Sequence, residues 1–236
     1  MPEGLEIERR GSTLVATVER GEENSFSGEM IDALADAIDG ASSEPGCRFV
    51  RLRARGSVFC VARDRVGTTP DQLRAEAGRI VRINETLRTS PMVTIAEVNG
   101  DAAGFGCGLV AASDIAIASE QARFWFPEIR TGLPPTVVIG WASKLLPAKR
   151  AFDMVVTGDP IGAATAAQVG LITQAVPTDA VSSRVDERIA AMEALHPEGV
   201  RDIKRFFAQV RTLDAPSAAR SSVDALVVGS LRLLRS

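Results

Sequence analysis

Residues 98–113 read V-N-G-D-A-A-G-F-G-C-G-L-V-A-A-S. An apolar run over 92–98 leads into them and ends at Asn99 and Gly100; glycines then recur at 104, 106 and 108, and small residues follow. This order predicts a buried strand, a glycine turn and a tightly packed helix, because glycine lets backbone approach backbone or a ligand closely. The first N–H groups of such a helix point outward, where they can bind an anion.

A carboxylate follows the glycine segment. Residues 123–132 read R-F-W-F-P-E-I-R-T-G, which places Glu128 close to the apolar residues Phe126 and Ile129. Fixed N–H donors near a carboxylate in apolar surroundings suit enolate chemistry, in which the donors hold the oxygen charge and the carboxylate moves a proton. Lone glycines more often serve helix packing, and a glutamate more often lies in a solvated loop. The flanking motifs therefore decide between these structural roles and a catalytic site.

Hydrophobic periodicity predicts an α/β fold with a mostly parallel sheet, because strands are separated by helical crossovers. In the helix expected over 71–88, the inward residues should be Leu73, Ala77, Ile80 and Leu87, and residues 56–70 are predicted to form a loop. The expected strands are 5–10 and 13–18 (a hairpin), 49–55, 92–98, 114–118 and 172–176. The remaining expected helices are 28–39, 135–145, 148–156, 163–169, 179–195, 198–212 and 217–234.

Composition narrows the class of protein. A chain of 236 residues with a net charge of −3 fits a single domain and implies no nucleic-acid partner. No apolar run reaches membrane-spanning length and the start does not resemble a signal peptide, which predicts a cytoplasmic protein without a membrane partner. Cys47, Cys60 and Cys107 lack metal-ligand spacing and His196 is the single histidine, so reduced, buried thiols and no metal site are expected.

Five motifs in order resemble the enoyl-CoA hydratase/isomerase (crotonase) superfamily. The segment 98–108 is similar to the family's V-N-G-x-A-x-G-G-G-x-E, and P-E-I-R-T-G at 127–132 to its P-E-x-x-x-G. The others are F-C-V-A-R-D at 59–64, N-S-F-S at 24–27 and G-D-P-I-G-A-A-T-A-A-Q-V-G-L-I at 158–172. The resemblance covers about residues 5–215 and implies a crotonase-like ββα spiral over 1–195 with a C-terminal helical oligomerisation region over 196–236.

The resemblance also implies a site. Its oxyanion hole would use the backbone N–H groups of Arg63 and Phe105, and Glu128 would be the acid/base. Asp64 and Asp114 are expected to be helix caps or structural hydrogen-bond acceptors rather than acids, and for Trp125 core packing is as good an interpretation as pocket lining. The residues expected to contact substrate are Asn24, Phe26, Cys60, Ala62, Asp64, Gly104, Gly106, Gly108 and Trp125.

One departure from the family bears on the reaction. Gly108 stands where hydratases of the family carry their first glutamate, and Asp101 belongs to a position that the family directs away from the chemistry. A single carboxylate suffices to move a proton between carbons two and four of an enoyl thioester, which favours isomerase-type chemistry. The alternatives are a hydratase or hydratase-lyase and a non-catalytic acyl-CoA-binding homologue. The expected ligand is an acyl-CoA thioester of fatty acid metabolism, with CoA as part of the substrate and no other cofactor.

The expected assembly is a homotrimer or a dimer of trimers. The family usually assembles in this way, and the last two helical patterns add an argument from the residues. Their apolar faces exceed what one core of this size needs to cover. The residues on these faces are Phe206, Phe207, Val210, Leu226, Val227 and Leu231.

Overall fold

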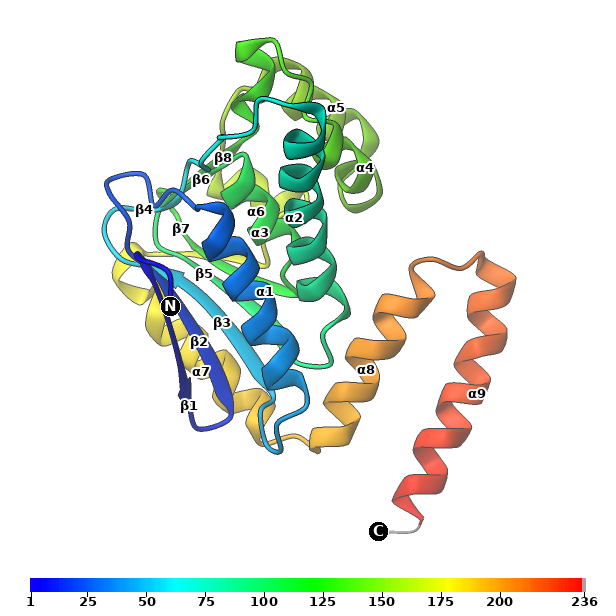
Figure 1. The fold of residues 1–236 in the computed structure, drawn as a ribbon. Coiled ribbons are helices and arrows are strands. Elements are labelled where there is room, and N and C mark those ends of the chain that lie inside the picture. Colours follow the sequence, from blue (N-terminus) through cyan, green and yellow to red (C-terminus); the bar gives the residue numbers. More distant parts are fainter. Residues whose placement is uncertain (235–236) are drawn as a thin grey trace.

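The larger of two sheets forms the centre of the molecule (Figure 1). The computed structural model describes residues 1–234. In this sheet the hairpin β1–β2 is antiparallel and every other pairing is parallel. The strand order is β1 (Leu5–Arg10), β2 (Thr13–Val18), β3 (Phe49–Ala54), β5 (Val93–Val98), β7 (Ile115–Ser119) and β10 (Gln174–Val176). The expectations of an α/β fold, a mostly parallel sheet and an N-terminal hairpin are confirmed.

A second, smaller sheet lies beside the first, and hydrophobic periodicity did not predict it. Its order is β4 (Val58–Cys60), β6 (Asp101–Ala103), β8 (Arg123–Trp125) and β9 (Ile161–Gly162). The first three strands are mutually parallel and β9 is antiparallel to β8. The expectation of an uninterrupted loop over 56–70 was therefore wrong, because β4 lies within it. Strands of two or three residues are too short to show a period-two pattern.

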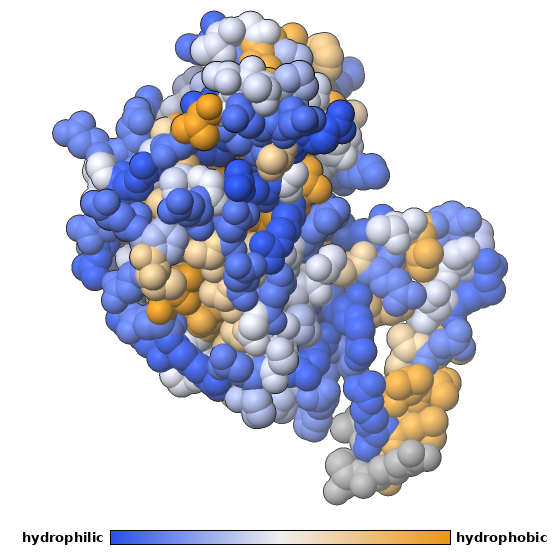
Figure 2. Space-filling model, viewed as in Figure 1, coloured by the Kyte–Doolittle hydropathy of each residue, from blue (hydrophilic) through white to orange (hydrophobic). Residues whose placement is uncertain are grey.

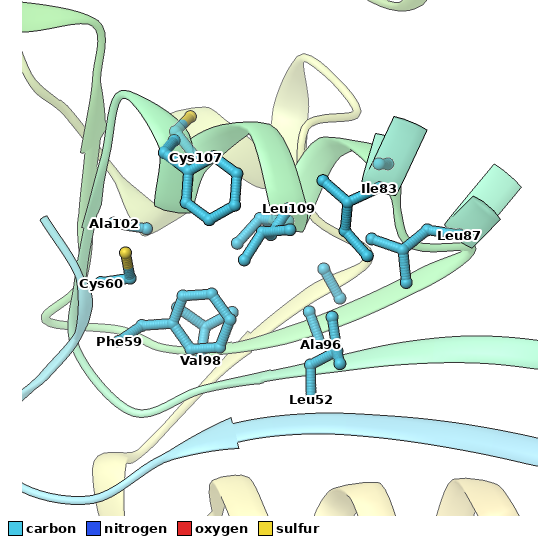
Figure 3. Close-up of a cluster of buried hydrophobic side chains, with 14 of the residues drawn as sticks. Leu52, Phe59, Cys60, Ile83, Leu87, Ala96, Val98, Ala102, Cys107 and Leu109 are labelled. Carbon is cyan, nitrogen blue, oxygen red and sulfur yellow. The ribbon is translucent and has the colours of Figure 1, made fainter. Parts of the chain in front are cut away.

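Helices cover both faces of the larger sheet. One apolar core joins α1 and α3 to one face and extends to the smaller sheet, and a second core packs α7 against the opposite face. The helices are α1 (Gly28–Ser42), α2 (Pro70–Thr89), α3 (Phe105–Ala112), α4 (Thr136–Leu145), α5 (Ala148–Thr157), α6 (Ala163–Gln168), α7 (Val181–Glu193), α8 (Pro197–Val210) and α9 (Ala215–Leu233), with short 3₁₀ helices η1 (Pro127–Thr131) and η2 (Thr178–Ala180). Figure 3 shows Leu109 of α3 and Leu87 of α2 above the strands.

The buried face of α2 differs from the predicted one. Leu87 is buried as expected, but Leu73 is 52% exposed, while Ala77 and Ile80 are only half-buried. The buried residues are Glu76, Ile83, Asn84, Thr86 and Leu87. The prediction of Leu73 as an inward residue was wrong. The apolar pattern could not anticipate that Glu76, a charged residue, is buried because its carboxylate accepts hydrogen bonds inside the protein.

The last two helices extend away from the sheets (Figure 1). None of the described side chains of α9 is buried, and α8 buries one, that of Lys204. The Lys204 ammonium donates to the backbone oxygen of Leu87 at 3.0 Å and to both carboxylate oxygens of Asp114. Asp114 also accepts from the N–H and hydroxyl of Thr94. It is a structural acceptor, as predicted. Among residues 1–234, no helix is both long and apolar enough to cross a membrane.

Removing Asp114 should lower the free energy of unfolding more than removing Lys204. We expect Asp114→Asn to lower the free energy of unfolding by about 3 kcal/mol, because it leaves the buried ammonium without a counter-charge. Lys204→Met should cost about 1 kcal/mol or less, since Asp114 is 26% exposed and keeps its two Thr94 donors. Urea unfolding of both variants measures the difference. Equal losses would mean that Lys204 is not held mainly by charge.

Candidate active site

Three chain segments meet at one edge of the smaller sheet. Residues 61–64 follow β4, residues 104 and 105 follow β6, and residues 126–128 follow β8. Because these three strands are adjacent and parallel, the segments leave them at the same end. In open parallel sheets the carboxyl ends of the strands are the usual place for a ligand. The arrangement brings together the three segments that carry the predicted site residues Arg63, Phe105 and Glu128.

Close contacts fix where α3 begins. A Cβ atom added to Gly106 would overlap the carbonyl oxygen of Cys60 at the end of β4. Gly104 has a φ of 52°, and an added Cβ atom would lie 2.8 Å from Oε1 of Glu128. The Gly104 N–H donates to the Trp125 carbonyl at 2.9 Å, which ties β6 to β8. Glycine is therefore required at 104 by conformation and space, and at 106 by space.

Two backbone N–H groups at this edge are free to bind a ligand. Phe26 bridges Arg63, with its N–H donating to the Ala62 carbonyl and its own carbonyl accepting from the Asp64 N–H. In this pattern the intervening residue turns its N–H to the opposite side. Phe105 is the first residue of α3, where helical N–H groups have no partner in the preceding turn. Within residues 1–234, neither the Arg63 nor the Phe105 N–H donates a hydrogen bond to the protein.

The Phe105 side chain is buried against Phe26. It is 8% exposed, and its ring centroid lies 5.1 Å from that of Phe26, with the planes tilted by 58°. This geometry is favourable for aromatic rings. A large side chain is unusual in a glycine turn, and that of Phe105 is accommodated by packing into the core beside Phe26.

Glu128 lies in η1 directly after β8 and is half-buried. Its Oε1 atom packs against Gly104, and its Oε2 atom is buried without a hydrogen-bond partner among the described residues. A buried carboxylate oxygen without a donor is costly unless a ligand or water meets it. Glu128 therefore presents an unsatisfied acceptor beside the first residues of α3.

Comparisons with known proteins decide the family. A family model described as enoyl-CoA hydratase/isomerase matches residues 8–227. The chain belongs to this family. Its members are also called crotonases, so the predicted resemblance is confirmed.

Relatives and solved structures agree with this assignment. The mitochondrial enoyl-CoA hydratase domain-containing protein 3 of Xenopus laevis is 35% identical over 179 residues, which is 71% of this chain but 58% of that protein. An enoyl-CoA hydratase of Mycobacterium tuberculosis is 32% identical over 216 residues, 86% of this chain and 79% of that one. A crystal structure of enoyl-CoA hydratase from Mycobacterium smegmatis superposes with a TM-score of 0.91 at 26% identity, covering 97% of this chain and 91% of that chain. The crotonase fold is confirmed.

Two residues predicted to contact substrate have structural partners in this crotonase. The Asp64 carboxylate accepts two hydrogen bonds from Arg20, both at 2.9 Å, and one from Ser25. These donors, chiefly Arg20, lower the pKa of the Asp64 carboxyl. Asn24, with a φ of 49°, is buried and spends both amide hydrogens on the backbone carbonyls of Arg55 and Val58. Asp64 is thus a structural acceptor, and the Asn24 amide has no hydrogen left for a ligand.

The remaining predicted contacts line or support the edge. Cys60 is buried and its Sγ donates to the Ala62 carbonyl; burial raises the pKa of its thiol to about 12, so it stays protonated. Trp125 is half-buried and has the Arg123 guanidinium over its ring. A Cβ atom added to Gly108 would meet nothing within 4 Å. All three cysteines are buried and unbridged, as predicted.

Sequence reasoning missed Glu76. Its buried carboxylate accepts from the Arg63 guanidinium and from two backbone N–H groups of the loop between β4 and α2. No motif marks this position, and the apolar pattern placed it outside the buried face. A metal site, a cofactor and a nucleic-acid partner were expected to be absent; these expectations, and the cytoplasmic location, stay predictions.

The glycines at 106 and 108 offer a matched pair of substitutions on one helix. We expect Gly106→Ala to destabilise the protein by about 3 kcal/mol or prevent folding, because the new methyl group must displace the Cys60 carbonyl. Gly108→Ala should be neutral or stabilising by up to about 1 kcal/mol, since space is open and alanine favours helix. Thermal unfolding compares them, and similar melting temperatures would contradict the contact.

Proposed function

We propose that this crotonase is an enoyl-CoA isomerase that uses Glu128 as a single acid/base. The observation that supports the proposal is that the N–H groups of Arg63 and Phe105 make no hydrogen bond to the described part of the chain, and that Glu128, at the same edge, has a carboxylate oxygen without a donor. Other carboxylates near this edge are engaged: Asp64 with Arg20, and Asp101 with the backbone N–H and guanidinium of Arg123. Glu128 is left as the group suited to moving a proton.

The proposed reaction moves one proton along the acyl chain. The thioester oxygen of a 3-enoyl-CoA accepts from the N–H groups of Arg63 and Phe105, and Glu128 removes a proton from carbon two. The electron pair of that bond forms a dienolate with the carbonyl, whose oxygen charge the two donors stabilise, each by about 3 kcal/mol. Glu128 then returns its proton to carbon four, the carbonyl reforms, and the double bond lies between carbons two and three.

Hydration is the second candidate, because the relatives in mycobacteria and the solved structure cited above are named enoyl-CoA hydratases. Adding water requires a group to orient it. The family's hydratases use a glutamate at the position of Gly108, and glycine has no side chain to orient a water molecule. A non-catalytic acyl-CoA-binding protein is the third candidate, and direct assay separates the three.

We also propose that the chain assembles as a trimer or a dimer of trimers. Apolar side chains stay exposed on the last two helices, and Figure 2 shows them gathered over part of α9. The exposed residues are Ile203, Phe207, Val223, Leu226, Val227, Val228 and Leu231. Of the residues predicted for these faces, Phe206 and Val210 are half-buried and the other four are exposed. Contact with further copies would remove this apolar surface from water.

The reaction is tested with panels of 2-enoyl- and 3-enoyl-CoA esters in deuterated water. We expect the double bond to move without gain of a water molecule, and deuterium to enter only to the extent that the Glu128 proton exchanges with solvent before its return to carbon four. Glu128→Gln should lower turnover by about 10³-fold or more while ligand affinity changes little, because the side chain keeps its shape but cannot carry the proton.

Glu120→Gln is the matched control, since Glu120 is exposed in the turn after β7 and its variant should turn over like the parent. A mass gain of one water would support hydration instead. Binding without turnover across both panels would support the non-catalytic candidate, and full activity of Glu128→Gln would remove that residue from the mechanism.

Assembly is tested by light scattering at micromolar concentration. We expect a mass of three or six chains of 25.0 kDa. Leu226→Glu together with Val227→Lys should shift the mass toward the monomer, because charged groups resist burial at an interface. Ser222→Glu, on the same helix, serves as the control. A parent protein that is monomeric would contradict the assembly.

A further inference from the structure

The loop between β4 and α2 carries the Arg63 N–H, and three of its donors converge on one carboxylate. Oε1 of Glu76 accepts from the Val66 N–H at 3.0 Å and from the Gly67 N–H at 2.6 Å. Oε2 accepts from the Arg63 guanidinium at 3.3 Å. The side chains are sheltered, with 10% of Glu76 and 16% of Arg63 exposed. Glu76 thus joins both ends of the segment 63–67 to the second turn of α2.

The next residues of the loop are also fastened to α2. Thr69 caps the helix and forms a capping box with Gln72, whose side-chain oxygen accepts from the Thr68 and Thr69 N–H groups. A Cβ atom added to Gly67 would lie 3.1 Å from both the Gln72 carbonyl carbon and Oε1 of Glu76. The loop therefore lies directly on the helix, and the backbone N–H groups of 66–69 bind its side chains.

On its other side the same segment is held by the bridge between Arg63 and Phe26. The Arg63 guanidinium reaches across the loop, donating to the Asp64 carbonyl at 3.0 Å as well as to Glu76. Glu76 gives this arginine a buried partner. The ion pair with Glu76 thus compensates the Arg63 charge within the protein.

We infer that Glu76 is a positioning residue for the oxyanion hole. Through Val66, Gly67 and the Arg63 side chain it holds the loop so that the Arg63 N–H faces the thioester oxygen. The inference rests on the proposed function for its catalytic consequence, because only an enolate-forming reaction needs this N–H. Its structural part, the holding of the loop by Glu76, concerns the protein alone. Burial opposes the charge of Glu76, but hydrogen bonds from Val66, Gly67 and Arg63 outweigh it and lower the pKa of the carboxyl.

The test compares Glu76→Ala, Glu76→Gln and Glu85→Gln in the full chain. Alanine removes every acceptor; glutamine keeps one oxygen for Val66 and Gly67 but turns an amide toward Arg63. Glu85 lies on the same helix, exposed and without a side-chain partner among the described residues, so its variant is the matched control. Three quantities are measured: amide hydrogen exchange over 63–67, kcat and KM with a 3-enoyl-CoA, and the infrared carbonyl frequency of a bound ¹³C-labelled enoyl thioester.

We expect exchange at Val66 and Gly67 to accelerate by about tenfold or more in Glu76→Ala. We expect kcat to fall by about tenfold to a hundredfold with KM changed less than about threefold, because a misplaced donor weakens transition-state stabilisation more than binding. The carbonyl frequency should move toward its value in water. Glu76→Gln should be intermediate, and Glu85→Gln should match the parent.

A merely structural Glu76 would give a different pattern. Faster exchange with unchanged kcat and unchanged carbonyl frequency would overturn the positioning role, and so would unchanged exchange in Glu76→Ala. If that variant does not fold, Glu76→Gln supplies the same readouts. Failure of the proposed function is recognised separately, since the parent would then turn over no 3-enoyl-CoA. In that outcome the catalytic part of the inference falls with it, and hydrogen exchange alone decides whether Glu76 holds the loop.

Discussion

The absence of a side chain at Gly106 is the constraint on which the site depends. It lets the first turn of α3 lie against the Cys60 carbonyl at the end of β4. Without this approach the helix would be pushed from the smaller sheet, and its leading N–H group would no longer face the same opening as the loop after β4. Two donors from distant parts of the chain are therefore aligned by backbone contact, which has few ways to relax.

Ion pairs add to this close packing in fixing the loop after β4. The loop that follows β4 is held from one side by Arg20 through Asp64 and from the other by Glu76 through Arg63. Both pairs are anchored by further hydrogen bonds from hydroxyl or backbone groups, which add to the directional charge-assisted hydrogen bonds of the pairs themselves. Glu128 differs, because one of its oxygens has no donor. The loop side chains are thus paired while the proposed acid/base is not, as expected of a preorganised site.

The sequence predicted the larger sheet well, because its strands are long enough for alternation to be visible. The hairpin 5–10 and 13–18 has the predicted bounds, and 93–98 differs from the prediction by one residue. The smaller sheet was not visible to periodicity, although it carries the site. Its position was available only through motifs, since Phe59 lies within β4, Gly104 directly follows β6, and Pro127 begins η1 after β8. Glu76 was missed for another reason: its burial depends on donors from a loop that no local pattern describes.

The exposure of α9 has a consequence for how the chain unfolds. The described side chains of α9 are all outside the core, and a helix in a protein draws most of its stability from the packing of its apolar face. Helix α9 should therefore not unfold together with the sheets as one cooperative unit in a lone chain, whereas α8 is tied to Leu87 and Asp114 through Lys204. Helix α9 would exchange its amides through local opening, far below the energy needed to unfold the sheets. Under the proposed assembly, further copies of the chain would cover its apolar face, and the order of this helix would then depend on protein concentration.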